Sequence, residues 1–288
     1  MSASVPLDPN LHPYRPDLAA EKLRGLVDAP RFAEATAYQV TAGVCPLRRS
    51  PEPDAEQLSQ ALHGATVEIY DEQDGFGWGQ MVADGYVGWF DMAALSAPVL
   101  PVHRRVSALR TYAFSEPAFR SAPRFLLSLN ATVSLTGREE AGFAECARCG
   151  WVFGGHLVPL DMFETDPVAV ALRFLDAPYQ WGGVESLGLD CSGLIQTAHA
   201  ACGIALPRDS YMMRTVGTPV GGPDALDQLR RGDLVLWDGH VGMMVDAGTL
   251  IHANTFRMQT ALEPLSEAVP RIAARFGPVL TLRRLMPA

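Results

Sequence analysis

The first half of the chain contains two blocks in which apolar and polar residues alternate, and the second block repeats the first. The blocks are ATVEIYDEQDGFGWGQ (65–80) and ATVSLTGREEAGFAECA (131–147), and their continuations, GYVGWFDMAAL and GWVFGGHLVPL, also match. Alternation is typical of half-buried strands, and glycine favours the turns between them, where we expect a positive φ at Gly75, Gly85, Gly142 and Gly150. A repeat of roughly 65 residues is too long for a solenoid unit and predicts a duplicated small β-barrel.

The pattern becomes helical at Asp166. The segment DPVAVALRFLDAP has Asp166 as N-cap, Pro167 as first helical residue and apolar residues at helical spacing. We expect Pro178 to end this helix. A second helix is predicted from Cys191 to Cys202, with Gly203 as its C-terminal cap and a buried side formed by Leu194, Ile195, Ala198 and Ala201.

These patterns divide the chain into four segments. Residues 1–35 predict an extended arm with one short helix, Leu18 to Val27, and residues 161–288 predict an α+β domain. Between them we expect two small β-barrels, at 36–98 and 99–160. The alternative for the repeated blocks is a pair of unrelated β-hairpins.

Composition narrows the class of protein. With 288 residues, 48% of them hydrophobic, the chain can build several cores and is not a disordered polymer. A net charge of −9 argues against nucleic acid or an anionic membrane as partner and favours a small soluble substrate. The N-terminus has no leader pattern, and no apolar run approaches the ~18 residues of a membrane helix. Five cysteines, an odd number, suit reduced thiols, so we expect a soluble, cytoplasmic protein.

Cys191 lies where a helix is predicted to begin. Asp190 is the expected N-cap, so Cys191 falls in the first turn, where unpaired N–H groups and the helix dipole favour a thiolate. The same N–H groups can stabilise an oxyanion on an attacked carbonyl. Ser192 and Gly193 are small enough for a substrate backbone to approach. The position is therefore suited to a nucleophile.

Two histidines downstream supply a base and a group to orient it. Strands are predicted at 234–237, 241–245 and 249–254, with His240 and His252 flanking the second hairpin. A two-residue turn would point the two rings apart. We predict the three-residue turn Asp246–Ala247–Gly248, because glycine at the third loop position is typical of a type I turn followed by a bulge, which needs a left-handed residue there. In this register Val245 pairs with Thr249 and Gly242 with His252. The imidazoles then share a face, with Cβ atoms ~7–8 Å apart.

Two other readings of these residues remain. His240, His252, Asp238 and Asp246 form a conceivable metal site, but no HExxH-type helix supports one, and we expect neither metal nor cofactor. Cys146 and Cys149 form a CxxC without a second pair, so we expect buried small hydrophobes there. For Cys191, His240 and His252 taken together, catalysis is the interpretation we adopt over buried structural residues.

The motifs LDCSG, LPRDS, GDLVLWDGHVGMMV and IHA follow one another in this order. The series resembles the NlpC-type cysteine peptidases of bacterial cell-wall metabolism, from about Asp166 to Arg284, while the local signature of true papains is absent. The resemblance implies a papain-like peptidase domain preceded by two SH3-like barrels. It also implies that Cys191 is the nucleophile, His240 the general base and then acid, and His252 the orienting residue.

Two barrels before the peptidase resemble γ-D-glutamyl-L-diamino acid endopeptidases, which recycle murein peptides with a free N-terminal L-Ala and release L-Ala-γ-D-Glu. The resemblance implies that Asp190 binds the substrate amine and that Tyr86 and Glu56 of the first barrel contact the substrate. For Tyr86 and Trp181, burial in a core is the rival interpretation. The remaining residues expected to line the cleft are Ser192, Trp181, Asp209 and Ser210.

Two alternatives to this function stay open. One is a peptidoglycan hydrolase or acyltransferase of the same fold acting on intact cell wall, which would need an open cleft. The other is a non-catalytic protein whose SH3-like domains bind a peptide. The diamino acid of the substrate and the oligomeric state are not determined by the sequence.

Overall fold

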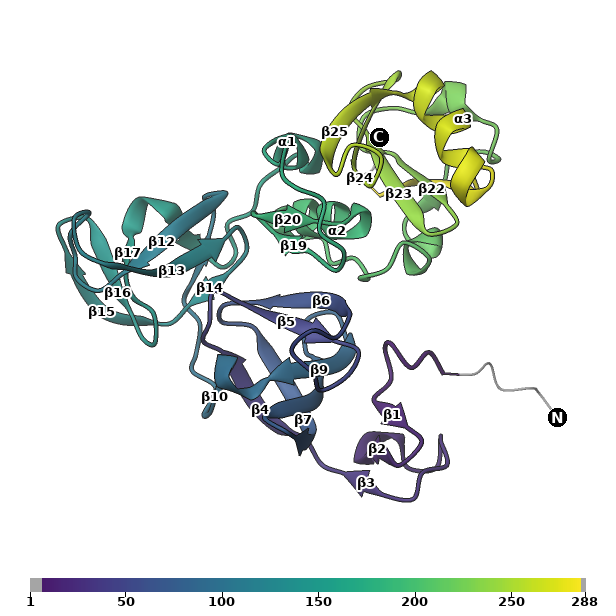
Figure 1. Cartoon of the computed structure of the whole chain (residues 1–288). Helices are drawn as coiled ribbons and strands as arrows, with labels where there is room; N and C mark the ends of the chain where they lie inside the picture. Colours follow the sequence, from purple (N-terminus) through teal and green to yellow (C-terminus); the bar gives the residue numbers. More distant parts are fainter. Residues whose placement is uncertain (1–6, 286–288) are drawn as a thin grey trace. The chain divides into compact units, whose positions relative to one another are not determined.

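The computed structural model describes residues 7–285 and divides the chain into two compact units, Met1–Pro159 and Leu160–Ala288 (Figure 1). The first unit is built almost entirely of strands. The second combines a six-stranded sheet with helices and carries the residues of the candidate site.

The first half of unit 1 is a seven-stranded antiparallel sheet in the order β10-β4-β7-β8-β9-β5-β6. Its strands are β4 (Thr36–Val40), β5 (Val44–Arg48), β6 (Gln57–Leu62), β7 (Thr66–Gln73), β8 (Phe76–Met81), β9 (Val87–Asp91) and β10 (Leu95–Ser96), with a 3₁₀ turn at Met92–Ala94. These strands lie within the 36–98 segment predicted for the first barrel.

The N-terminal segment is not the helix-containing arm that its sequence predicts. It forms a small sheet of β1 (Tyr14–Arg15), β2 (Leu18–Ala20) and β3 (Phe32–Ala33), followed after β2 by a 3₁₀ turn at Glu21–Leu23. The predicted helix at Leu18–Val27 is therefore wrong. Leu18 and Ala20 are fully buried and pack in one cluster with Trp78 and Trp89, so tertiary packing overrides local helix propensity.

The second half of unit 1 has a five-stranded sheet, β13-β12-β17-β16-β15, and a three-stranded sheet, β14-β11-β18. The strands are β11 (Arg104–Val106), β12 (Arg110–Phe114), β13 (Pro123–Ser128), β14 (Thr132–Val133), β15 (Leu135–Glu140), β16 (Phe143–Cys146), β17 (Gly150–Phe153) and β18 (Leu157–Pro159), with a 3₁₀ turn at Gly154–His156. Both sheets share one core around Val106, Leu127 and Val152.

The two repeated blocks form matching hairpins. The β7–β8 turn has φ of 52° at Asp74 and 82° at Gly75, and the β15–β16 turn has φ of 50° at Ala141 and 82° at Gly142. Two consecutive positive φ values define the type I′ turn that suits a two-residue hairpin. Gly85 and Gly150 also have positive φ, so the expectation for all four turn glycines is confirmed.

Unit 2 is organised around the sheet β21-β26-β22-β23-β24-β25. Its strands are β21 (Thr218–Pro219), β22 (Leu234–Trp237), β23 (His240–Met244), β24 (Thr249–Asn254), β25 (Gln259–Pro264) and β26 (Thr281–Arg284), with a separate pair β19 (Val184–Glu185) and β20 (Gly188–Leu189). The helices are α1 (Pro167–Leu172), α2 (Cys191–Ala201) and α3 (Leu265–Phe276), and 3₁₀ turns lie at Met212–Thr215 and Leu226–Gln228.

The α1 helix begins as its sequence predicts and ends earlier. The Asp166 carboxylate accepts a hydrogen bond from the Val168 amide at 2.9 Å, with Pro167 in the first turn. The helix stops at Leu172, and the predicted end at Pro178 is wrong. After Leu172 the chain continues in i→i+3 turns and reaches φ 64° at Asp176, which a continuing helix cannot contain.

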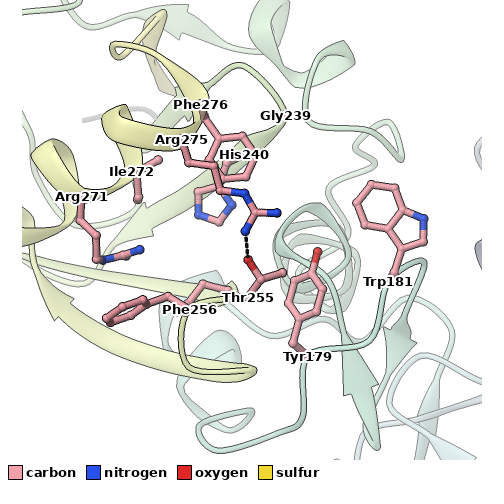
Figure 2. A pocket seen from close by; sticks show the side chains of 11 residues that line it. Tyr179, Trp181, Gly239, His240, Thr255, Phe256, Arg271, Ile272, Arg275 and Phe276 are labelled. Atoms are coloured by element: carbon pink, nitrogen blue, oxygen red, sulfur yellow. Dashed lines mark hydrogen bonds between the residues drawn. The ribbon is translucent and has the colours of Figure 1, made fainter.

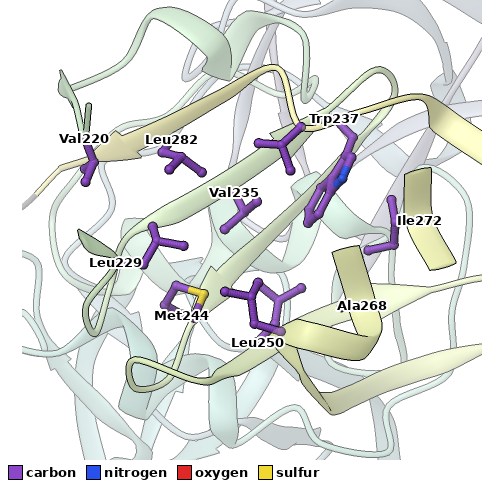
Figure 3. Packing of buried hydrophobic residues seen from close by; sticks show 11 residues of the cluster. Val220, Leu229, Val235, Trp237, Met244, Leu250, Ala268, Ile272 and Leu282 are labelled. Carbon is purple, nitrogen blue, oxygen red and sulfur yellow. The ribbon is translucent and has the colours of Figure 1, made fainter. Parts of the chain in front are cut away.

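The core of unit 2 fixes α3 on the sheet. Leu265, Ala268 and Ile272, at helical spacing, pack in one buried cluster with strand residues that include Val235 and Leu250 (Figure 3). On the other face of the same strands, alternate residues such as Leu236, Val241, Met243 and Ile251 are also fully buried. Both faces of the sheet are therefore covered, and the end of α3 lies beside the first residue of β23.

Candidate active site

Cys191 is the first residue of α2, as predicted, and Asp190 is the N-cap, accepting a hydrogen bond from the Gly193 amide at 2.7 Å. The four residues expected on the buried side of the helix are fully buried, and Gly203 has the left-handed φ of a C-terminal cap (76°). Cys191 itself is 6% exposed. The sulfur therefore lies at a helix N-terminus with only a small part of its surface accessible.

Gly193 serves packing rather than substrate access. A Cβ added there would lie 2.0 Å from the Gly183 carbonyl oxygen, far below any van der Waals contact. The missing side chain lets the start of α2 lie against the loop before β19. The expectation that Gly193 makes room for a substrate backbone is replaced by this contact, which fixes where Cys191 sits.

His240 and His252 meet in the register predicted for their hairpin. Met243 pairs with Ile251 and Met244 with Leu250, and the Val245 amide bonds the Thr249 carbonyl at 2.8 Å, so the loop has three residues. His240 Nε2 lies 2.9 Å from His252 Nδ1. The predicted register and the shared face of the two rings are confirmed.

The physical reason predicted for that register is wrong. Gly248 is not among the glycines with a left-handed φ. Instead, the Asp246 carboxylate accepts hydrogen bonds from the amides of Gly248 (2.9 Å) and Thr249 (2.8 Å). Asp246 therefore closes the loop with its side chain, as Asp commonly does in turns.

Two functional residues that the sequence analysis did not select extend the histidine pair. His252 Nε2 lies 3.0 Å from Glu263 Oε2 in β25, and Glu263 Oε1 accepts a hydrogen bond from Arg271 Nε of α3 at 2.7 Å. Glu263 is 4% exposed. The sequence signal for it is a single carboxylate in the otherwise mostly apolar strand QTALEP, two residues beyond Ala261, the partner of His252.

This network assigns the tautomers of both rings. A carboxylate only accepts, so His252 Nε2 carries the proton that Glu263 accepts, and His252 Nδ1 is left as an acceptor. His240 Nε2 must then donate to His252 Nδ1. The remaining nitrogen, His240 Nδ1, keeps its lone pair and is the atom that can take a proton.

Burial controls the protonation of the site. It raises the pKa of the Cys191 thiol to about 12, with the Asp190 charge adding to the rise and the amide of Val241 opposing it. Burial lowers the pKa of His240 to about 3, helped by the charges of His252, Arg271 and Arg275. Burial therefore favours the neutral thiol and the neutral imidazole in the resting pair, and it opposes the thiolate-favouring effect expected at the helix N-terminus.

His252 and Glu263 have opposite effects on one another. Burial lowers the pKa of His252 to about 4, although the Glu263 carboxylate acts to raise it. Burial acts to raise the pKa of Glu263, but the Arg271 guanidinium prevails and the net direction is downward. Glu263 is therefore ionised at neutral pH and holds the Nε2–H tautomer of His252.

Cys191 lies next to β23, the strand that begins at His240. The Val241 amide, one residue beyond His240, hydrogen-bonds the Cys191 sulfur and acts to lower its pKa, as does the amide of Ser192. Burial raises the pKa of the Tyr179 hydroxyl, and the Cys191 and Asp190 charges add to this rise. Cys191, the start of β23 and Tyr179 thus lie together.

Asp190 and Ser192 belong to a buried ion-pair network. Arg208, 1% exposed, pairs with Asp190 Oδ2 at 2.6 Å and donates to Ser192 Oγ at 2.9 Å. Gly182 and Gly193 amides also donate to the Asp190 carboxylate. Arg208, in the LPRDS motif, is a further residue that the sequence analysis missed.

The other predicted substrate residues occupy different environments. Trp181 is 59% exposed, so the rival interpretation of a core tryptophan is wrong. In the Arg208–Asp209–Ser210 run, Ser210 is buried and Asp209 partly buried. In unit 1, Tyr86 is 3% exposed, which favours the rival interpretation of a core tyrosine. Glu56 is exposed and pairs with Arg49 at 2.5 Å.

A cavity of about 690 Å³ opens beside His240 (Figure 2). Tyr179 and Trp181 line one side, and the others lining it are Gly239, His240, Asn254, Thr255, Phe256, Arg271, Ile272, Arg275 and Phe276. Phe276 stacks on His240 with ring centroids 5.8 Å apart and an 18° tilt. The imidazole therefore has a protein wall on one side and the cavity on another.

The sequence offered two further groups of side chains, the conceivable metal ligands and the CxxC pair. Within residues 7–285, no three His, Cys, Asp or Glu side chains come together as a metal site. All five cysteines are free, and Cys146 and Cys149 are buried in the core of the second half of unit 1, as expected.

Two parts of the chain match known protein families. Residues 176–271 match the NlpC/P60 family and residues 47–95 match the bacterial dipeptidyl-peptidase SH3 domain. A solved NlpC/P60 family protein from Bacillus cereus ATCC 10987 has a TM-score of 0.73 and 18% identity, covering 88% of this chain and 100% of that one. At this identity the structural match shows the fold alone.

Among curated relatives, dipeptidyl-peptidase 6 of Lysinibacillus sphaericus is 25% identical over 80% of this chain and 92% of that protein. The γ-D-glutamyl-L-lysine dipeptidyl-peptidase of Bacillus subtilis is 27% identical over 64% of this chain and 66% of its own length. A probable endopeptidase of Mycobacterium tuberculosis is 35% identical, but the chain spans only 29% of that protein.

Proposed function

From an NlpC/P60 domain that follows a bacterial SH3 domain, we propose a cysteine peptidase that hydrolyses the bond between γ-D-Glu and a diamino acid. The proposed substrates are small murein peptides with a free N-terminal L-Ala, and the product is L-Ala-γ-D-Glu. The observation that carries the proposal is the hydrogen-bonded chain His240–His252–Glu263 beside Cys191. The B. subtilis relative, named for γ-D-glutamyl-L-lysine, supports the choice of bond.

The mechanism follows from the neutral resting pair. As the Cys191 sulfur attacks the γ-D-Glu carbonyl carbon, its proton passes to His240 Nδ1, and His252 with Glu263 stabilises the imidazolium. Amides at the start of α2 stabilise the oxyanion. His240 then protonates the leaving amine, the C–N bond breaks and a thioester remains. Water, losing its proton to His240, attacks the thioester, and the C–S bond breaks to regenerate the thiol.

The finer parts of the proposal concern the substrate amine and the domains. Asp190 is the proposed amine-binding acid, which requires one of its present donors to give way. Tyr86 and Glu56 are proposed to support amine recognition, and Ser192, Trp181, Asp209 and Ser210 to line the acyl side. We also infer that residues 99–160 form a second SH3-like barrel, supported by the matching hairpin turns, and that the enzyme works in the cytoplasm.

Product analysis tests the function. Wild-type protein incubated with L-Ala-γ-D-Glu-L-Lys, and with its diaminopimelate counterpart, should release L-Ala-γ-D-Glu, detected by mass spectrometry, whereas Cys191→Ala should not. The N-acetylated peptides should be cut far more slowly. Equal cleavage of acetylated and free peptides would contradict the amine requirement, and absence of any cleavage of the γ-D-Glu bond would contradict the function itself.

A further inference from the structure

The cavity beside His240 contains an arginine without an acidic partner. Arg271 is neutralised by Glu263, but Arg275 hydrogen-bonds Thr255 Oγ1 at 2.8 Å and lies over the Phe276 ring at 5.1 Å. Among residues 7–285, no carboxylate forms an ion pair with Arg275, and none of the residues lining the cavity is acidic. In a chain of net charge −9, this is a local positive site.

The direction of Arg275 places its charge inside the cavity. Figure 2 shows its guanidinium pointing from the end of α3 toward Thr255, between His240 and Tyr179, while Arg271 lies on the side of Phe256. Its charge is among the causes that lower the pKa of His240, after burial, His252 and Arg271. Arg275 therefore lies within electrostatic reach of the general base.

The chemistry of the reaction decides which part of a substrate occupies this cavity. His240 protonates the leaving amine, so the leaving group must lie against His240 when the C–N bond breaks. The cavity adjoins His240 and is flanked by Tyr179, Trp181 and Phe256, whereas Cys191 is not among its lining residues. The aromatic rings offer apolar contact to an aliphatic chain, and the guanidinium offers a fork of donors to a carboxylate.

We propose that this cavity is the leaving-group site and that Arg275 binds a carboxylate of the departing amino acid. The inference rests on the proposed function. It adds a preference for substrates in which the residue after the scissile bond is the last residue of the peptide or carries a second acid. The carboxylate is either the free α-carboxylate of a C-terminal residue or the side-chain carboxylate of diaminopimelate. Binding either one neutralises the Arg275 charge next to His240 as the base gains its proton.

The test compares kcat/KM for three peptides: L-Ala-γ-D-Glu-L-Lys, its C-terminal carboxamide, and the diaminopimelate peptide with its α-carboxylate amidated. The kcat/KM of wild type should be about 10- to 100-fold lower on the lysine carboxamide than on the free acid, mostly through a higher KM. This is the loss expected for one charge-assisted hydrogen-bonded pair. On the free acid, the kcat/KM of Arg275→Met should be lower than that of wild type by the same factor, and this variant should cut acid and amide equally. Arg275→Lys should recover part of the kcat/KM on the free acid. Full activity on the amidated diaminopimelate peptide identifies the side-chain carboxylate as the ligand.

Arg173→Met, which removes an equal charge from a half-exposed ion pair outside the cavity, is the matched control and should keep the wild-type preference. The inference is overturned, with the proposed function left standing, if wild type cuts the lysine acid and amide equally and also cuts the amidated diaminopimelate peptide no faster than the lysine amide. It is overturned likewise if Arg275→Met keeps the wild-type preference. If wild type cuts none of the peptides, the proposed function fails. Saturation-transfer NMR then tests whether the cavity binds a carboxylate. Binding of L-lysine that exceeds binding of L-lysinamide and is lost in Arg275→Met supports the site, and equal binding of the two overturns it.

Discussion

Glu263 fixes the proton positions on which the proposed chemistry depends. Its carboxylate accepts from His252 Nε2, which leaves His252 Nδ1 to accept from His240 Nε2 and frees His240 Nδ1 as the base. The sequence selected Cys191, His240 and His252 as candidate catalytic residues from motif and register. It could not identify Glu263, because its pairing depends on the β24–β25 register and on Arg271 in α3.

The tautomer assignment predicts different effects for two substitutions of Glu263. In Glu263→Gln the amide oxygen can still accept from His252 Nε2, so kcat should fall only several-fold. In Glu263→Leu no acceptor remains, and kcat should fall about 100-fold with little change in KM, because the base loses its orientation. Steady-state kinetics of both variants measure this. Equal losses in both variants would show that charge, and not the hydrogen-bond acceptor, is what matters.

Buried histidines also predict how stability depends on pH. Burial lowers the pKa of His199 to about 4, and its Nδ1 bonds the Ile195 carbonyl at 2.8 Å while Nε2 has no partner in the described residues. The unfolded chain takes up a proton near pH 6.5 and the folded chain only near pH 4, so the free energy of unfolding falls as pH drops through this window.

The substitution His199→Leu removes this titrating group, which lies outside the candidate active site, and with it the His199 contribution to the pH dependence of unfolding. Between about pH 6 and 4.5 the slope of unfolding free energy against pH should be shallower than in wild type by up to ~1.4 kcal/mol per pH unit. Urea unfolding of both proteins across this range measures the two slopes. The contribution of unit 1 is the same in both proteins and cancels in the difference between the slopes. Parallel slopes would mean that His199 is protonated equally in the folded and unfolded chains.

At the scale of elements, the hairpin that carries the histidines shows what local sequence can predict. The three-residue loop predicted from the position of Gly248 brings both rings to one side, and β23 and β24 have that register. The turn chemistry was misassigned, because Asp246 closes the loop and Gly248 does not adopt a left-handed φ. The end of α1 was also missed, since the turns after Leu172 are set by tertiary contacts such as the Asp176 amide with the Thr260 carbonyl.

Two glycines, Gly193 at the start of α2 and Gly242 in β23, predict contrasting effects of substitution by alanine. At Gly193 a Cβ would meet the Gly183 carbonyl oxygen at 2.0 Å, a backbone atom that cannot move alone. At Gly242, in β23, the nearest atoms, at 2.9 Å, belong to the buried Leu250 side chain, which can shift by a few tenths of an ångström without moving the backbone. Gly193→Ala should therefore destabilise the fold by about 1–3 kcal/mol and lower activity strongly, whereas Gly242→Ala should be milder in both. Denaturant unfolding and peptidase assays compare the two variants, and a milder Gly193→Ala would contradict the packing account.

At the scale of the whole molecule, the repeat in the sequence predicted a duplicated small β-barrel with positive φ at four turn glycines. The structure has the four positive φ values and two hairpins with matching turns, and the second barrel stays a proposal. The N-terminal segment was mispredicted because Leu18 and Ala20 find their partners, Trp78 and Trp89, some sixty residues later. Such long-range burial leaves no local pattern. None of the helices within residues 7–285 has the length and apolar composition to cross a bilayer.

The central claim is that Cys191 attacks the γ-D-Glu carbonyl, and trapping the acyl-enzyme tests it most directly. Wild-type protein mixed with L-Ala-γ-D-Glu-L-Lys, quenched in acid during turnover and digested, should yield one peptide containing Cys191 that carries the L-Ala-γ-D-Glu acyl group, as read by mass spectrometry. His240→Ala should accumulate far less of it. A Cys191→Ala protein that still releases L-Ala-γ-D-Glu, or an acyl group found on another residue, would contradict the account.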